Sequence, residues 1–301
     1  MSAVSKRSDV TAKEVAESRR EYQHAGDVLQ PHKRLFDVWL SQYFGNHKRT
    51  QKIASDYAVN IINDDYTGID EDEAKTLKVA PTIAAAKRFF HWELEFPEIY
   101  FDERERREDG GFDAVIGNPP YVRQEGLADD KMAFKALYTA YNSIADLYTY
   151  FIERGHILLR LGGRFSMITA NKFMRANYGA ALRELLTKRV KLERLVDFGD
   201  LPVFNDASAY PVIVMFNNVQ RNGDPIEYAL IKSLAFTSLP NAIKDSANGL
   251  PESAFQGDSW SLTQGTEQRI LVVHSLSLYQ LFQMLVWLLE AMQAIYNLPR
   301  I

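Results

Sequence analysis

The tetrapeptide Asn118-Pro119-Pro120-Tyr121 combines groups that suit chemistry on an aromatic amine. Such an amine is a poor nucleophile because the ring delocalises its nitrogen lone pair. The side-chain oxygen of Asn118 and the carbonyl oxygen of Pro119 can both accept hydrogen bonds from the NH₂ group. Two acceptors pull the nitrogen toward sp³ geometry and leave its lone pair facing a sulfonium methyl group. Proline keeps the loop stiff and has no N–H that competes for the acceptors, so the tetrapeptide predicts methyl transfer to an exocyclic nitrogen.

Tyr121 adds an aromatic ring that can stack on the acceptor base, a contact worth about 1–3 kcal/mol. The tetrapeptide follows directly after Phe112–Gly117, an apolar run typical of a buried strand. Ligands of α/β sheets bind at the carboxyl ends of the strands, which is where this loop falls. Asn and Pro are also ordinary turn residues, so a rigid turn without function is the alternative. The position after a strand favours the functional interpretation.

The elements that must position this loop form an alternating pattern from residue 112 onward. Further strands are predicted at 164–169, 193–198, 212–217 and 226–231, and helices at 144–161, ended by Gly162-Gly163, and at 176–189. This order is typical of a parallel α/β sheet with crossover helices, and the paired strands near the end suggest an antiparallel edge. Upstream, helices are predicted at 11–24, at 31–45 between Pro31 and Gly45, and at 81–90, with an acidic loop at 64–73.

Composition supports a folded intracellular protein. The chain has 301 residues, of which 46% are hydrophobic and 12% aromatic, enough to bury a sizeable core. It has no cysteine, which excludes disulfides, iron–sulfur clusters and a thiolate nucleophile. Cytosine C5 methylation is therefore excluded, because that reaction needs a cysteine to attack the ring. The N-terminus is polar and charged rather than a signal peptide, so we expect a cytoplasmic protein. No metal site is predicted.

No segment is basic enough to indicate nucleic-acid binding by composition, since the net charge is −4. A nucleic-acid enzyme would rely on a local basic face. The residues between Arg154 and Arg194 can supply one, including Lys172, Arg175, Arg183, Lys188, Arg189 and Lys191. A solvated helix surface is the alternative interpretation.

Four stretches of the sequence resemble one family. They are FDAVIGNPPYVRQE and the segments Phe90–Phe101, Asp146–Leu186 and Val196–Phe216. Together they resemble the adenine-specific DNA methyltransferases of type IIG restriction–modification enzymes and BREX phage-defence systems. The resemblance implies a Rossmann-like α/β sheet and methyl transfer from S-adenosylmethionine (SAM) to N6 of adenine in double-stranded DNA, the adenine being flipped out of the helix.

The resemblance also implies roles for individual residues. Asn118 and Pro119 would hold the adenine amino group, with Pro120 completing the motif, and Tyr121 would stack on the ring. A later motif of the family contributes a second aromatic residue near the base. Tyr210 is the candidate for it, with Phe204 behind it.

The sequence departs from the family pattern where SAM should bind. A Gly-rich turn after a first strand is expected before the tetrapeptide, and none is found between Met1 and Phe112. A target-recognition domain is expected after Trp260 and is not evident. We therefore expect an incomplete methyltransferase sheet, a fragment that needs a separate SAM-binding or target-recognition polypeptide. The expected domains are a helical segment at 1–110, the partial catalytic core at 111–240 and a tail at 241–301.

The tail contains an apolar run at 270–289, with 15 apolar residues of 20 and no charge. Its length permits a membrane span, but its His, Ser and Gln residues favour a partner-facing helix or an out-of-register tail. Two alternatives to the DNA methyltransferase remain. One is a methyltransferase acting on guanine N2 in RNA or on a protein glutamine. The other is a catalytically incompetent fragment or a DNA-binding subunit without a SAM site.

Overall fold

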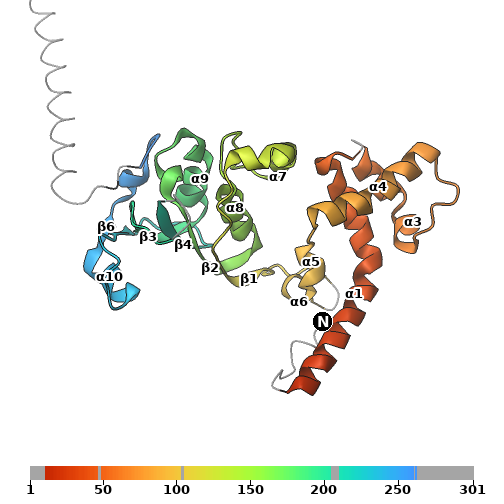
Figure 1. Cartoon of the computed structure of the whole chain (residues 1–301), viewed down its shortest axis with the longest axis horizontal. Coiled ribbons are helices and arrows are strands. Elements are labelled where there is room, and N and C mark those ends of the chain that lie inside the picture. The colour runs from red at the N-terminus through yellow and green to blue at the C-terminus, as the bar shows by residue number, and fades with distance from the viewer. Residues whose placement is uncertain (1–10, 47–48, 103–104, 205–209, 261, 263–301) are drawn as a thin grey trace, which may run out of the picture.

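The computed structural model describes residues 11–46, 49–102, 105–204, 210–260 and 262. These residues form a helical N-terminal part and a six-stranded mixed sheet flanked by helices (Figure 1). The strands are β1 (Phe112–Gly117), β2 (Leu159–Ala170), β3 (Lys191–Asp197), β4 (Pro211–Asn217), β5 (Ile226–Leu230) and β6 (Ala247–Leu250). Their order in the sheet is β1-β2-β4-β3-β5-β6. The α/β class with a helical N-terminal segment, predicted from the sequence, is confirmed.

The sheet mixes parallel and antiparallel pairs. β1 pairs with β2 and β3 pairs with β5 in parallel, while β4 runs antiparallel between β2 and β3. β6 pairs antiparallel with β5 at one edge. The antiparallel edge suggested by the last predicted strands is thus not formed by β4, which lies inside the sheet and is separated from β5 by β3. The strands β1, β2, β3 and β5 run in the same direction. Their carboxyl ends lie along one border of the sheet, which we call the carboxyl edge, and β4 begins there.

The glycine pair at 162–163 lies inside β2, not at the end of a helix as expected. Helix α8 (Tyr148–Leu158) ends just before β2 begins. A Cβ on Gly163 would lie 2.8 Å from the carbonyl oxygen of Phe112, so a side chain there would push β1 away from β2. The pair therefore lets the two strands approach closely at the edge of the sheet opposite the carboxyl edge.

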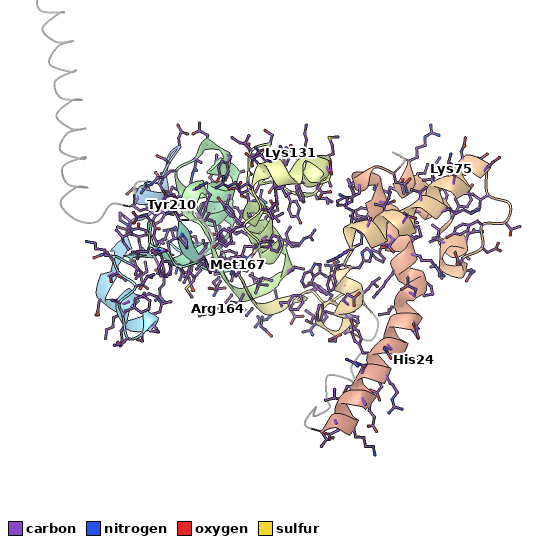
Figure 2. The ribbon with its side chains drawn as sticks, in the orientation of Figure 1. His24, Lys75, Lys131, Arg164, Met167 and Tyr210 are labelled. Atoms are coloured by element: carbon purple, nitrogen blue, oxygen red, sulfur yellow. The ribbon has the colours of Figure 1, made fainter. Side chains whose placement is uncertain are left out.

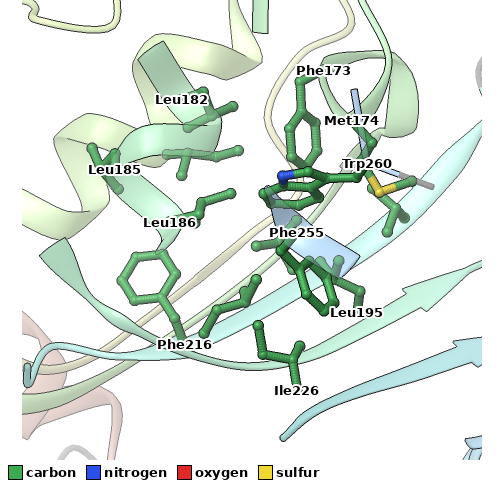
Figure 3. Packing of buried hydrophobic residues seen from close by; sticks show 14 of the residues in the cluster. Phe173, Met174, Leu182, Leu185, Leu186, Leu195, Phe216, Ile226, Phe255 and Trp260 are labelled. Atoms are coloured by element: carbon green, nitrogen blue, oxygen red, sulfur yellow. The ribbon is translucent and has the colours of Figure 1, made fainter. Parts of the chain in front are cut away.

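Two hydrophobic clusters cover the two faces of the sheet. On one face, Phe216, Leu195 and Ile226 pack beneath Leu182 and Leu186, with Phe255 and Trp260 in the same cluster (Figure 3). On the other face, helix α10 (Leu239–Ser246) covers Val196, Ala229 and their neighbours. The remaining elements around the sheet are α7 (Lys131–Leu137), α9 (Ala180–Glu184), the 3₁₀ turns η2 (Gln124–Asp130), η3 (Asn171–Met174), η4 (Asn177–Gly179) and η6 (Glu252–Phe255), and the π-helical turn η5 (Leu185–Arg189).

The packed core continues past residue 240, where the sequence placed the end of the catalytic core. Leu250, Phe255 and Trp260 belong to the same buried cluster as β2 and β4. The backbone N–H of Trp260 also donates to the carbonyl oxygen of Met174 at 2.7 Å. The sheet thus uses residues that the pattern of strands alone assigned to the tail. The apolar run at 270–289 lies outside the described residues.

The N-terminal part packs around its own small core of Val38, Ile53, Ile61 and Leu77. Its elements are α1 (Ala12–Ser41), η1 (Gln42–Phe44), α2 (Thr50–Asp56), α3 (Ala58–Asn63), α4 (Glu71–Lys87), α5 (Trp92–Glu95) and α6 (Pro97–Tyr100). The separate helices predicted at 11–24 and 31–45 are one helix with Pro31 inside it, and Pro81 lies inside α4. Each proline loses one backbone hydrogen bond, but packing of both helices against this core keeps them continuous.

The end of the predicted acidic loop is instead the first turn of α4. Asp70 caps that helix by accepting hydrogen bonds from the N–H groups of Asp72 and Glu73, and acidic residues in a first turn are favourable to the helix dipole. The N-terminal part meets the sheet through rings that surround Phe112, with centroid distances of 5.7 Å to Trp92 and 5.3 Å to Phe96. Across the described ranges, no helix is long and apolar enough to span a membrane.

Candidate active site at the carboxyl edge of the sheet

The tetrapeptide Asn118–Tyr121 leaves the sheet directly at the end of β1. The pairing of Gly117 with Met167 of β2 fixes its start. Pro119 is buried, while Asn118 and Pro120 are exposed. Just beyond it, the N–H of Val122 donates to the Pro120 carbonyl at 2.9 Å, and the N–H of Leu147 donates to the Val122 carbonyl at 3.1 Å. The loop is therefore anchored on both sides.

The two acceptors that the sequence singled out are free for a substrate. Among the described residues, no donor bonds to the side-chain oxygen of Asn118 or to the carbonyl oxygen of Pro119. Pro119 is restrained because it is buried, whereas the preceding Asn118 is exposed. This part of the loop presents two acceptors and no competing backbone donor.

An aromatic pair stands next to these acceptors. The ring of Tyr121 lies against the ring of Phe204, with centroids 5.6 Å apart and an interplanar angle of 58°. Burial raises the pKa of the Tyr121 hydroxyl above its ordinary value, so the group is neutral at physiological pH. That hydroxyl is buried and makes no hydrogen bond within the described structure. Phe204, which the sequence placed behind Tyr210, is thus the aromatic residue in contact with Tyr121.

Tyr210 lies elsewhere on the same edge. Its side chain is 47% exposed, and its carbonyl accepts a 2.7 Å hydrogen bond from the N–H of Asn171. It lines a hollow of about 590 Å³ together with Asp197, Tyr228 and Lys172. In Figure 2, Tyr210 lies above Met167 and Arg164, two residues of β2. The role of Tyr210 as a second ring at the base stays a prediction.

Asp197, which sequence reasoning missed, ties the strand ends together. Its buried carboxylate accepts from Asn171 Nδ2 at 2.9 Å, from the Gly199 N–H at 2.9 Å and from the Tyr228 hydroxyl at 3.1 Å. These donors come from the loops after β2 and β3 and from β5. Burial raises the pKa of Tyr228, and the negative charge of Asp197 raises it further. An aspartate at the end of an apolar strand was the available signal for this group.

The described residues suit a methyl acceptor better than the SAM donor. Upstream of β1 they form helices and turns, without a strand that leads into a Gly-rich turn. No described strand pairs with the second edge of β1, and Ile116 in that strand is 85% exposed. The residues present therefore do not fit the nucleoside and amino-acid parts of SAM. Nor do the described residues contain a group of three His, Asp or Glu side chains that could hold a metal ion.

Comparisons with known proteins place the chain among restriction–modification methylases. A family model described as the Eco57I restriction-modification methylase matches residues 22–204. The type II methyltransferase M.PaeR7I of Pseudomonas aeruginosa is 40% identical over 111 residues, which are 36% of this chain and 19% of that protein. The type II restriction enzyme and methyltransferase RM.Eco57I of Escherichia coli is 28% identical over 125 residues, 40% of this chain and 12% of that protein.

A solved chain of a type I restriction–modification system superposes with a TM-score of 0.41 at 14% identity and covers 63% of this chain and 46% of that one. The matched stretch is less than a fifth of the length of either curated relative. The family model, in contrast, covers more than half of the 301 residues. On that match, this chain belongs to the Eco57I restriction–modification methylase family.

Proposed function

We propose that this chain carries the acceptor side of a DNA methyltransferase specific for N6 of adenine, in a restriction–modification or phage-defence system. The observation that carries the proposal is that the Asn118 side-chain oxygen and the Pro119 carbonyl have no hydrogen-bond donor among the described residues, in the loop that also carries the Tyr121–Phe204 ring pair. An adenine amino group has two N–H donors, which match the two acceptors in number. DNA is the substrate because the relatives are named as type II methyltransferases and a restriction enzyme.

In this proposal the residues of the chain hold and orient the base. The target adenine leaves the DNA stack and enters the carboxyl edge of the sheet. Asn118 Oδ1 and the Pro119 carbonyl oxygen each accept one N–H of its amino group. The Tyr121 ring stacks on the purine, and Phe204 fixes the plane of the Tyr121 ring by packing against it. The lone pair of N6 then points away from both acceptors, toward the methyl donor.

SAM is the methyl donor that the family implies. We assign its site to a separate SAM-binding polypeptide, because the described residues supply the acceptor only. The same reasoning applies to the target-recognition domain. We further propose a cytoplasmic location, where the DNA substrate is found.

A second candidate function is a DNA-binding subunit that transfers no methyl group. The absence of a Gly-rich turn in the described residues favours it. Methylation of RNA guanine N2 or of a protein glutamine remains the alternative for the acceptor, since both carry an NH₂ group on a planar carbon. The acceptor experiment below distinguishes these substrates, because each can be offered in turn.

The test measures binding of adenine, so it does not depend on SAM. The probes are two fluorescein-labelled 20-base-pair duplexes, one with a single bulged adenine and one with a bulged purine that lacks the amino group. A bulged base removes most of the unpairing cost. Two hydrogen bonds of about 0.5–1.5 kcal/mol each favour adenine over purine by about 5- to 150-fold. Asn118→Ala removes one acceptor and reduces that preference by about 2- to 12-fold.

The matched control is Asn241→Ala, which removes an exposed asparagine from α10 on the far side of the sheet. It should leave the adenine preference unchanged. Asn118→Asp keeps an acceptor oxygen and should retain more of the preference than Asn118→Ala. Equal affinity of the unmodified protein for the two probes would refute the proposed acceptor site. Stronger binding of a guanine-bearing RNA or of a glutamine peptide would redirect the substrate assignment.

A further inference from the structure

The basic residues between Arg154 and Arg194 divide into those engaged within the fold and three that are not. Those engaged are Arg154 with the Tyr138 hydroxyl, Arg160 with Asp113, Arg164 with Glu193, Arg183 with three carbonyls, Lys188 with Glu184, Lys191 with Asp224 and Arg194 with Glu227. In the described ranges, Lys172, Arg175 and Arg189 make no ion pair or side-chain hydrogen bond. All three are exposed.

Two of these three cations lie at the carboxyl edge. Lys172 and Arg175 follow the carboxyl end of β2, and the loop that carries Asn118 follows the same end of the neighbouring strand β1. Neighbouring strands in a sheet are about 4.8 Å apart. Arg189 ends η5 just before β3 begins, which places it at the opposite edge. The sheet thus separates two free cations near the proposed base site from a third that is far from it.

The backbone presents Lys172 and Arg175 on one side of the loop. Residues 171–174 form a 3₁₀ turn, in which side chains three positions apart point the same way. The N–H of Arg175 donates to the Lys172 carbonyl at 3.1 Å, which continues that turn. Both side chains line the hollow that contains Tyr210. Two positive charges therefore face one space.

The loop that carries the two cations is rigid because buried residues hold it. Arg183, only 4% exposed, donates from Nη1 to the carbonyl of Phe173 at 2.6 Å and to that of Ala176 at 2.8 Å. Phe173 is fully buried. A Cβ on Gly179 would lie 2.1 Å from the Phe173 carbonyl oxygen, so the chain closes tightly on itself there. Holding the loop in this way reduces the entropy lost when the cations bind a ligand.

The carboxylates near the two cations differ in how they are engaged. Asp197 in the same hollow is buried and accepts three hydrogen bonds from Asn171, Gly199 and Tyr228, so it is satisfied by the fold. Asp200 lines the hollow as an exposed side chain and forms no ion pair with Lys172 or Arg175. An anion with several oxygen acceptors can replace water on the two cations, since Lys acts as a point charge and Arg as a fork.

We propose that Lys172 and Arg175 bind a backbone phosphate of the DNA strand next to the flipped nucleotide. This inference rests on the proposed function, since it takes the base site at Asn118 as the point from which the strand leaves. The phosphate contacts carry no sequence information; they fix the strand so that the target base reaches the tetrapeptide. Arg183 acts as a positioning residue, because it holds the loop without touching the DNA.

The experiment uses the full chain and the duplex with a bulged adenine, titrated between 50 and 200 mM KCl. Each phosphate contact contributes about 0.9 to the slope of log affinity against log salt. The double variant Lys172→Ala/Arg175→Ala removes both contacts to this one phosphate and should therefore lower the magnitude of the slope by about 0.9. Arg189→Ala, which removes an equally exposed cation from the other edge, should leave the slope unchanged. The charge-preserving swap Lys172→Arg/Arg175→Lys should retain the slope.

Two readouts separate this inference from the proposed function. The salt slope reports on Lys172 and Arg175, while the adenine-over-purine preference reports on Asn118. A reduced slope with the preference retained supports the phosphate site, whereas a reduced slope without any adenine preference refutes the base site and overturns the placement of this phosphate next to a flipped nucleotide. A double variant with the unmodified slope, an equal loss in Arg189→Ala, or an unmodified protein that binds neither duplex would overturn it. Unchanged circular dichroism of the variants excludes unfolding as the cause.

Discussion

Removal of the Arg183 guanidinium should strongly destabilise the sheet. This side chain is 4% exposed and donates to the carbonyls of Phe173, Ala176 and Asp258. Burial lowers the pKa of Arg183, and its Nε–H has no partner in the described structure, so part of the cost of burying the charge is uncompensated. Arg183→Met keeps most of the volume but removes the Arg183 hydrogen bonds to three carbonyls, of which that of Ala176 keeps the N–H of Gly179 as a second donor. Hydrogen bonds to a charged donor contribute about 1.5–3 kcal/mol each, and their loss overlaps, so we expect a net loss of about 3–5 kcal/mol.

Urea unfolding followed by circular dichroism measures this change, with the free energy of unfolding taken from the midpoint and the slope. Folded domains have a free energy of unfolding of about 5–15 kcal/mol. The variant should therefore remain folded but lose a large share of its stability. Arg183→Lys keeps the charge and loses the fork, and should recover part of the loss. Arg189→Met is the matched control and should change stability by less than about 0.5 kcal/mol. A loss below about 1 kcal/mol in Arg183→Met would refute the structural role of this side chain.

Three further predictions follow from single positions. Gly179→Ala should lower the free energy of unfolding by about 1–3 kcal/mol, because its Cβ would lie 2.1 Å from the Phe173 carbonyl oxygen. Gly26→Ala, in open space on α1, should instead raise it by about 0.5–1 kcal/mol. Equal effects of the two variants in urea unfolding would contradict this. Burial raises the pKa of Tyr150 to about 12, so the folded state keeps the hydroxyl proton that the unfolded chain loses near pH 10. The free energy of unfolding should therefore fall as the pH rises from 10 toward 12. A constant value across that window would refute the prediction. Ile116→Lys should raise solubility with little change in melting temperature, because the side chain is 85% exposed, and a clear fall in melting temperature would show that Ile116 is packed.

The strands were predictable because each is a short apolar run bounded by polar or turn residues. β1, β3, β4 and β5 begin and end within two residues of the predicted ranges. β2 was predicted too short, since its first half contains the glycine pair that usually ends an element. The reason is tertiary: Gly163 leaves room for the Phe112 carbonyl of the adjacent strand. Local sequence does not record which neighbour a strand will approach.

The helices of the N-terminal part show the opposite limit. Pro31 and Pro81 are strong local signals for a boundary, and both lie within continuous helices. The tendency of proline to end a helix is outweighed here by the packing of α1 and α4 against the core around Val38 and Leu77. A proline inside a helix costs about 3 kcal/mol relative to alanine. This cost is offset when the helix on both sides of the proline buries apolar surface.

At the candidate site, the sequence identified the tetrapeptide but not the residues that complete it. The spacing of Asn118 to Tyr121 is local and was readable directly. The ring contact between Tyr121 and Phe204 depends on the path of the chain after β3, which the strand pattern does not contain. The sequence named Lys172 and Arg175 only within a longer series of basic residues. The structure distinguishes them, because most of the other members form ion pairs or hydrogen bonds within the fold.

A small apolar cluster connects the loop of the proposed base site (Asn118–Tyr121), called the base loop, with the loop of the proposed phosphate site (Lys172–Arg175), called the phosphate loop. Val122, next to the tetrapeptide, and Tyr178, three residues after Arg175, both pack against Leu127 and its neighbours. The Tyr178 hydroxyl also shares a 2.9 Å hydrogen bond with the hydroxyl of Tyr148 on α8. Because both loops stand on this cluster, the distance between the proposed base and phosphate sites is set by packing rather than by the loops themselves. Disturbing the cluster should therefore lower the adenine preference and the salt slope together, whereas changes within either loop should affect only one of the two.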